Sequence, residues 1–135
     1  MSNGDEPSGW EALIVDDNAD NLSIAAQLLS FHGAEVHTAQ NGSDALQLLE
    51  KVTPTFILLD LTMPGLDGWQ TLEKIRSNPK TANTPVIALT GHTMDEELKR
   101  IKEVGFNGYI TKPYLMANFL KSIKDVLKGP QEAAE

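Results

Sequence analysis

Short apolar segments alternate along this chain with longer stretches whose apolar residues recur every three or four positions, and this alternation restricts the fold more than any other feature. We predict strands at residues 11–15, 35–38, 55–59, 85–89 and 108–110. Residues 56–59 and 86–89 are almost uninterrupted apolar runs, typical of strands covered on both faces of a parallel sheet. Since crossovers between parallel strands are right-handed, the five strand–helix units predict an α/β fold with a doubly wound sheet.

The stretches between these strands carry helix signals. Thr93 followed by Glu96 has the spacing of a capping box at a helix start. Gly33 and Gly105 stand where helices would end in a left-handed residue. The apolar residues Leu98, Ile101 and Val104 follow this capping box. Two sets of apolar residues have the spacing of one buried helix face: Ala45, Leu48, Leu49 and Val52; and Met116, Phe119, Leu120 and Ile123.

The composition fits one folded domain. With 135 residues, of which 41% are hydrophobic and 22% charged, the chain can build a single core. We assign residues 10–128 to this domain and treat residues 1–9 and 129–135 as flexible tails, the second of them acidic. A second domain has no room, so we expect no DNA-binding output domain.

Charge and residue types exclude several function classes. The chain has 19 acidic and 11 basic residues, a net charge of -8, which does not attract nucleic acid. It has no cysteine, which excludes disulfides and cysteine-based zinc sites. No stretch approaches the roughly 20 apolar residues of a membrane span. We therefore expect a cytoplasmic protein that binds neither nucleic acid nor membrane.

Polar side chains gather where the predicted strands end. Asp16 and Asp17 follow the first strand directly, Asp60 ends the third, Thr90 ends the fourth, and Lys112 lies just past the fifth. In a doubly wound sheet the carboxyl ends of the strands form the ligand crevice, so these side chains should meet there. Three carboxylates in one place repel one another, and oxygen ligands without sulfur or imidazole suit Mg²⁺.

Phosphoryl transfer to a carboxylate uses such a set of groups. The reaction needs an in-line nucleophile and positive charge on the transferred oxygens. Asp60 would be the nucleophile, and Lys112 and the Thr90 hydroxyl would contact the phosphoryl group. Asp16 and Asp17, with the backbone carbonyl of Thr62, would hold Mg²⁺.

Four segments in this order resemble the receiver domain of two-component response regulators. They are Ala12-Leu13-Ile14-Val15-Asp16-Asp17-Asn18; residues 58–68 with Met63-Pro64 and Asp67-Gly68; Pro85-Val86-Ile87-Ala88-Leu89-Thr90; and residues 105–113 with Lys112-Pro113. The resemblance covers residues 10–127 and implies a flavodoxin-like sheet of strand order 2-1-3-4-5 with five helices. It also implies a stand-alone signalling phosphoacceptor, not a turnover enzyme, that receives a phosphoryl group on Asp60 from a histidine kinase or histidine phosphotransfer protein.

The same resemblance implies how the signal leaves the domain. On phosphorylation Thr90 moves toward the phosphoryl group and Tyr109 follows it inward, a population shift between two packings. The face made by the fourth helix, fifth strand and fifth helix then binds a downstream protein. We expect a monomer or a weak, phosphorylation-dependent dimer.

Plainer interpretations of single residues stay open. Asp16 and Asp17 could be ordinary N-terminal acids that cap a helix at Asn21 or Leu22. Tyr109 could be a half-buried strand tyrosine without a switching role. His92 lies close enough in sequence to Thr90 to influence the water that hydrolyses the acyl phosphate.

Other residues near the site favour structural roles. Asp67 and Gly68 are typical of a turn and helix start, and Trp69 of packing.

Two other functions compete with the receiver. A phosphohydrolase of the haloacid-dehalogenase type also uses a strand-terminal aspartate and Mg²⁺, and Asp60-Leu61-Thr62 resembles its nucleophile segment superficially. That family places the nucleophile after its first strand and needs a larger chain. A flavin- or nucleotide-binding domain would require a glycine-rich loop after a strand, and the sequence has none.

Overall fold

The computed structural model describes residues 7–91, 94–112, 114 and 116–128. Within these residues the chain alternates strands and helices, as the sequence predicts. The strands are β1 (Glu11–Val15), β2 (Glu35–Ala39), β3 (Phe56–Asp60), β4 (Val86–Thr90) and β5 (Gly108–Thr111). The helices are α1 (Ala19–Phe31), α2 (Gly42–Leu48), α3 (Gly68–Ser77), α4 (Asp95–Val104) and α5 (Met116–Lys128), preceded by one 3-10 turn at Pro7–Gly9.

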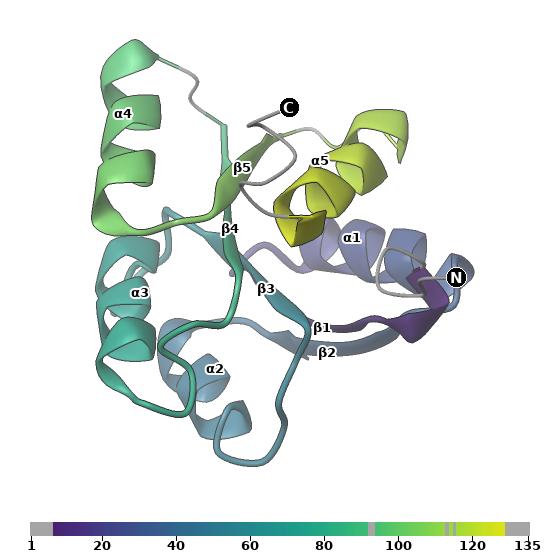
Figure 1. Cartoon of the computed structure of the whole chain (residues 1–135), viewed down its shortest axis with the longest axis horizontal. Coiled ribbons are helices and arrows are strands. Elements are labelled where there is room, and N and C mark those ends of the chain that lie inside the picture. Colours follow the sequence, from purple (N-terminus) through teal and green to yellow (C-terminus); the bar gives the residue numbers. More distant parts are fainter. Residues whose placement is uncertain (1–6, 92–93, 113, 115, 129–135) are drawn as a thin grey trace.

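The strands form one parallel sheet in the order β2-β1-β3-β4-β5, which confirms the expected topology. Helices α1 and α5 lie on one face of the sheet, and α2, α3 and α4 lie on the other (Figure 1). The carboxyl ends of β1, β3 and β4 are therefore neighbours at one edge of the sheet, which we call the carboxyl edge. This arrangement brings the predicted site residues together.

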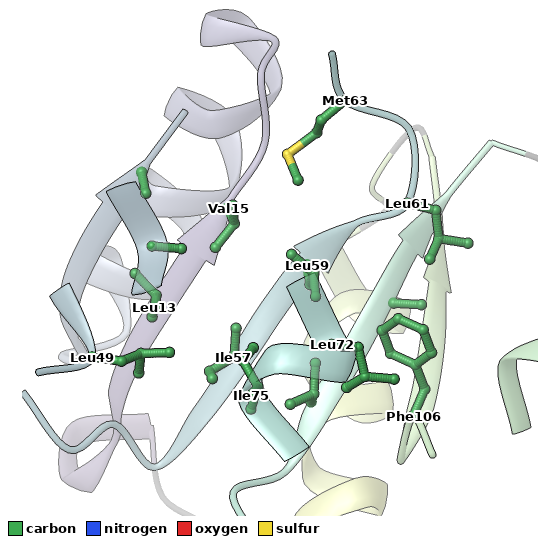
Figure 2. Close-up of a cluster of buried hydrophobic side chains, with 14 of the residues drawn as sticks. Leu13, Val15, Leu49, Ile57, Leu59, Leu61, Met63, Leu72, Ile75 and Phe106 are labelled. Carbon is green, nitrogen blue, oxygen red and sulfur yellow. The ribbon is translucent and has the colours of Figure 1, made fainter. Parts of the chain in front are cut away.

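The sheet separates two hydrophobic layers. On the side of α2, α3 and α4, strand residues such as Leu13, Ile57 and Leu59 pack against Leu72 and Ile75 of α3 (Figure 2). The layer on the side of α1 and α5 joins these elements to the opposite side chains of the same strands. Its largest fully buried members are Phe56, Phe119, Ile14, Leu29, Leu58, Ile87 and Leu89. Since β1, β3 and β4 contribute to both layers, their apolar runs have no polar face.

Asp60 and Thr90 are the last residues of β3 and β4, as predicted, one residue beyond the predicted ranges 55–59 and 85–89. Both are consequently held by the sheet itself, with Asp60 in register with Leu89 and Thr90 with Thr111.

Helix ends confirm two predictions. Gly33 and Gly105 have φ angles of 96° and 111°, the left-handed conformation expected at helix ends. The N-cap of α4 is Met94, without a side-chain capping bond, and the predicted cap residue Thr93 lies outside the described residues. Val104, in the last turn of α4, is 44% exposed.

Two further features concern the ends and the surface. Pro7–Gly9, the last three residues of the predicted N-terminal tail, form a turn in which the Trp10 N–H donates to the Pro7 carbonyl at 3.0 Å. Among the described residues, no helix has the length and apolar character required to cross a membrane.

Candidate functional site

Three acidic side chains meet at the carboxyl edge of the sheet. One carboxylate oxygen from each of Asp16, Asp17 and Asp60 lies within 4.8 Å of the others, and we call these three residues the acidic cluster. Asp16 is fully buried and Asp60 is 3% exposed, whereas Asp17 is exposed. Hard carboxylate oxygens, one of them open to solvent, fit a divalent cation such as Mg²⁺ that keeps part of its water shell.

Lys112 connects two members of the acidic cluster. Its Nζ lies 3.2 Å from Asp16 Oδ2 and 3.1 Å from Asp60 Oδ1. The backbone fixes the base of this side chain, because the Lys112 N–H donates to the Thr90 carbonyl at 2.9 Å. The structure thus brings the side chains of Asp16, Asp60 and Lys112 together, with the Thr90 backbone beside them.

The surroundings of Asp60 disfavour its charge. Burial raises the pKa of the Asp60 carboxyl from 3.8 to about 6, and the nearby Asp16 carboxylate acts in the same direction. Lys112 opposes this shift, as does the Thr62 N–H, which donates to Asp60 Oδ1 at 3.3 Å. Desolvation therefore outweighs the ion pair, and Asp60 is a more basic carboxylate than an exposed aspartate.

The loops on either side of the acidic cluster are ordered by local hydrogen bonds. Asp16 Oδ1 accepts the Asn18 N–H at 2.9 Å, and Asn18 caps α1 by accepting the Asn21 N–H at 2.9 Å. Helix α1 is therefore capped by Asn18, and the interpretation of Asp16 and Asp17 as its capping residues is wrong. Neither carboxylate serves as the side-chain cap of α1.

The start of α3 explains the Asp-Gly pair of the acceptor segment. Asp67 is the N-cap: its Oδ1 accepts the Gln70 N–H at 2.9 Å, while the Asp67 N–H donates to Gln70 Oε1 at 3.0 Å. Gly68 lies against β3, where a Cβ would overlap the Asp60 carbonyl oxygen and lie 2.7 Å from the Leu61 Cα. The structural roles predicted for Asp67 and Gly68 are confirmed.

Tyr114 is a site residue that the sequence analysis missed. Its hydroxyl lies 3.4 Å from Asp16 Oδ2, and its ring packs on Phe119 with the centroids 5.2 Å apart. Burial and the charges of Asp16 and Asp60 raise the pKa of Tyr114, so the hydroxyl keeps its proton. The available signal was a tyrosine two positions after Lys112, because a buried tyrosine hydroxyl needs a polar partner.

The remaining residues singled out from the sequence have different outcomes. Trp69 packs against Phe106 with ring centroids 5.8 Å apart, and the Arg100 guanidinium lies 3.9 Å from the centre of its ring, which confirms a packing role. Tyr109 is 42% exposed on β5, and its switching role stays a prediction. His92 lies outside the described residues.

A second group of metal-type side chains lies at the opposite end of the strands. His37 Nε2 is 2.8 Å from Glu11 Oε2 and 3.6 Å from Glu35 Oε2, and one ligand atom from each of these residues lies within 4.8 Å of the others. The grouping is explained by an ion pair between strands, from His37 of β2 to Glu11 of β1, and by a second contact of His37 to Glu35 on its own strand.

Comparisons with known proteins agree with this fold. Protein PilH of Pseudomonas aeruginosa is 36% identical over 119 residues, which cover 87% of this chain and 97% of that protein. The chemotaxis protein CheY4 of Vibrio cholerae has a TM-score of 0.82 at 30% identity, covering 86% of this chain and 97% of that one.

A solved receiver domain provides a comparison for the acidic cluster. The receiver domain of the sensor histidine kinase PA1611 from Pseudomonas aeruginosa, described with a magnesium ion coordinated in the active-site cleft, has a TM-score of 0.81 at 27% identity. The match covers 90% of this chain and 99% of that one. A family model described as the response regulator receiver domain matches residues 12–124. Because this match spans most of the described fold, the chain belongs to the receiver domain family of two-component response regulators.

Proposed function

We propose that this receiver domain is a phosphorylation switch in which Asp60 accepts a phosphoryl group from a histidine kinase or a histidine phosphotransfer protein. The observation that carries the proposal is the position of Lys112 Nζ, within 3.2 Å of both Asp16 and Asp60 at the carboxyl edge. An ammonium group shared by two buried carboxylates lies close enough to stabilise the negative charge of a phosphoryl group that is transferred to Asp60.

In the proposed reaction, an Asp60 oxygen attacks the phosphorus of the donor phosphohistidine. The new bond joins this oxygen to phosphorus, the phosphorus–nitrogen bond breaks, and the imidazole leaves with its electron pair. With a pKa of about 6, Asp60 is mostly ionised at pH 7 and is a stronger nucleophile than an ordinary aspartate.

Five other residues have proposed roles around Asp60. Lys112 turns from the two carboxylates to a phosphoryl oxygen, and the Thr90 hydroxyl donates a hydrogen bond to another. Asp16 and Asp17, with Asp60 and the backbone carbonyl of Thr62, would hold Mg²⁺, which supplies neutralisation of the charge on the phosphoryl oxygens.

The signal would leave by protein–protein contact through the face of α4, β5 and α5. Tyr109 of β5 and Val104 of α4 are exposed large side chains on these elements, at 42% and 44%. Residues 10–128 act as the switching unit in the cytoplasm, as a monomer or a weak dimer formed on phosphorylation. The net charge of -8 supports a protein partner rather than nucleic acid.

Intact-mass spectrometry after incubation with acetyl phosphate and Mg²⁺ tests this function. We expect one phosphoryl group on the wild-type protein and none on Asp60→Asn. Asp44→Asn, which changes an exposed carboxylate in the first turn of α2, is the matched control and should accept the group as the wild type does.

Two results would contradict the proposal. One is an equal adduct on Asp60→Asn, which would place the acceptor elsewhere. The other is repeated turnover of a phosphate monoester such as p-nitrophenyl phosphate, which would favour the phosphohydrolase instead.

A further inference from the structure

Asp16 is the most completely enclosed member of the acidic cluster, and three protein groups donate to it. The Asn18 N–H reaches Oδ1 at 2.9 Å. Lys112 Nζ and the Tyr114 hydroxyl share Oδ2, at 3.2 and 3.4 Å. Because Asp16 has no exposed surface, its charge depends on these donors rather than on bulk water.

The fold fixes the position of the Tyr114 hydroxyl. The ring packs against Phe119, which is fully buried in α5, with an interplanar angle of 47°. Tyr114 also belongs to the partly buried residues that pack on the α1 and α5 layer of the core. A phenylalanine would make the same packing contacts, so the hydroxyl is the part of the side chain that serves the acidic cluster.

We propose that Tyr114 is a positioning residue of the phosphoacceptor site, whose hydroxyl orients the Asp16 carboxylate for a divalent cation. This inference rests on the proposed function. Lys112 alone cannot do this, since it is shared with Asp60 and turns to the phosphoryl group in the proposed reaction. When Lys112 has turned away, the Tyr114 hydroxyl is the remaining side-chain donor to Asp16 Oδ2. It keeps this buried carboxylate oxygen hydrogen-bonded.

Removing the hydroxyl should weaken cation binding. Loss of a hydrogen-bond partner from a metal-ligating carboxylate typically costs about 10–100-fold in metal affinity. The 3.4 Å contact is longer than a typical O–H···O bond. We therefore expect Tyr114→Phe to lower Mg²⁺ affinity by about 10-fold, the low end of the range for such partners.

The test compares Mg²⁺ binding with phosphoryl acceptance. Calorimetric titration of Mg²⁺ into the full chain gives the affinity directly. In acetyl phosphate assays, the Mg²⁺ concentration for half-maximal rate should rise by the same factor in Tyr114→Phe. The rate at saturating Mg²⁺ should stay within about twofold of the wild type, because Asp60 and Lys112 are intact.

Thr81→Val is the matched control for the loss of a buried hydroxyl. The Thr81 hydroxyl donates to the Ile75 carbonyl at 2.6 Å, between α3 and β4 and outside the acidic cluster. This variant should lose stability in urea unfolding with EDTA but keep the wild-type Mg²⁺ affinity. Tyr114→Phe should show the altered affinity even though its ring packing is preserved.

The outcomes separate this inference from the function on which it rests. An unchanged Mg²⁺ affinity in Tyr114→Phe, with or without lost stability, would overturn the positioning role. Tighter binding would also overturn it, since the hydroxyl would then compete with the cation for Asp16. A wild-type protein that neither binds Mg²⁺ nor accepts a phosphoryl group would overturn the proposed function as well.

Discussion

Asp60 is a reactive carboxylate in a buried position, and its burial lowers the stability of the folded protein. It is the last residue of a strand buried on both faces, next to another buried carboxylate, Asp16. Lys112 only partly compensates for this placement, because the pKa of Asp60 still rises to about 6. The ionised carboxylate is therefore less stable in the folded protein than in water.

At the residue scale, Asp60→Asn should stabilise the protein in EDTA at pH 7.5. A shift of about two pKa units corresponds to about 3 kcal/mol, and we expect a gain of about 1–3 kcal/mol in the free energy of unfolding. The folded state binds the Asp60 proton more tightly than the unfolded state, so the wild type loses stability as pH rises from about 4 to 6. The gap between variant and wild type should be complete above pH 7 and should close toward pH 4.

Urea unfolding of both proteins at several pH values measures this gap, with Asp44→Asn as the control for removal of an exposed charge. A variant less stable than the wild type at pH 7.5 would mean that the Lys112 ion pair outweighs desolvation of Asp60.

Helix α3 shows how an element positions the site. Its capping box at Asp67 fixes where the helix begins, and its first residue, Gly68, packs directly on the Asp60 backbone. Strand β3 and the start of α3 are thus in direct backbone contact. This contact fixes both ends of the loop that contains Thr62.

At the element scale, Gly68→Ala should destabilise the protein by about 1–3 kcal/mol, because the added Cβ meets rigid backbone of Asp60 and Leu61. Displacement of β3 should also slow phosphoryl acceptance. Gly91→Ala is the control for stability: it follows Thr90, but a Cβ there has no heavy atom within 4 Å, and its effect should stay within about 0.5 kcal/mol. Thermal unfolding and the acetyl phosphate assay check both expectations, and equal stability of the two variants would contradict them.

The whole molecule is two hydrophobic layers on one shared sheet. Trp10 belongs to the layer of α1 and α5, and Trp69 packs against the layer of α2, α3 and α4. Strand β3 supplies Leu58 to the first layer and Leu59 to the second, so neither layer can lose its order without the other.

At the scale of the molecule, the two layers should unfold in one transition. In Trp69→Phe the fluorescence reports on Trp10, and in Trp10→Phe it reports on Trp69. In each variant the fluorescence and far-ultraviolet circular dichroism should give coincident urea midpoints. A Trp69 transition at clearly lower urea than the dichroism would show that the α3 and α4 side unfolds separately.

The sequence by itself determined the strand–helix alternation, the parallel sheet and the meeting of Asp16, Asp17, Asp60 and Lys112 at one edge. These follow from local periodicity and from the common direction of parallel strands, while the strand order came from the resemblance to a known family. Only the tertiary structure decided which donor each carboxylate receives. Tyr114 and Asp16 are 98 residues apart, and their contact depends on how α5 packs on the sheet. The raised pKa of Asp60 likewise depends on burial by distant elements. Such properties arise from the sum of long-range contacts, which local patterns do not encode.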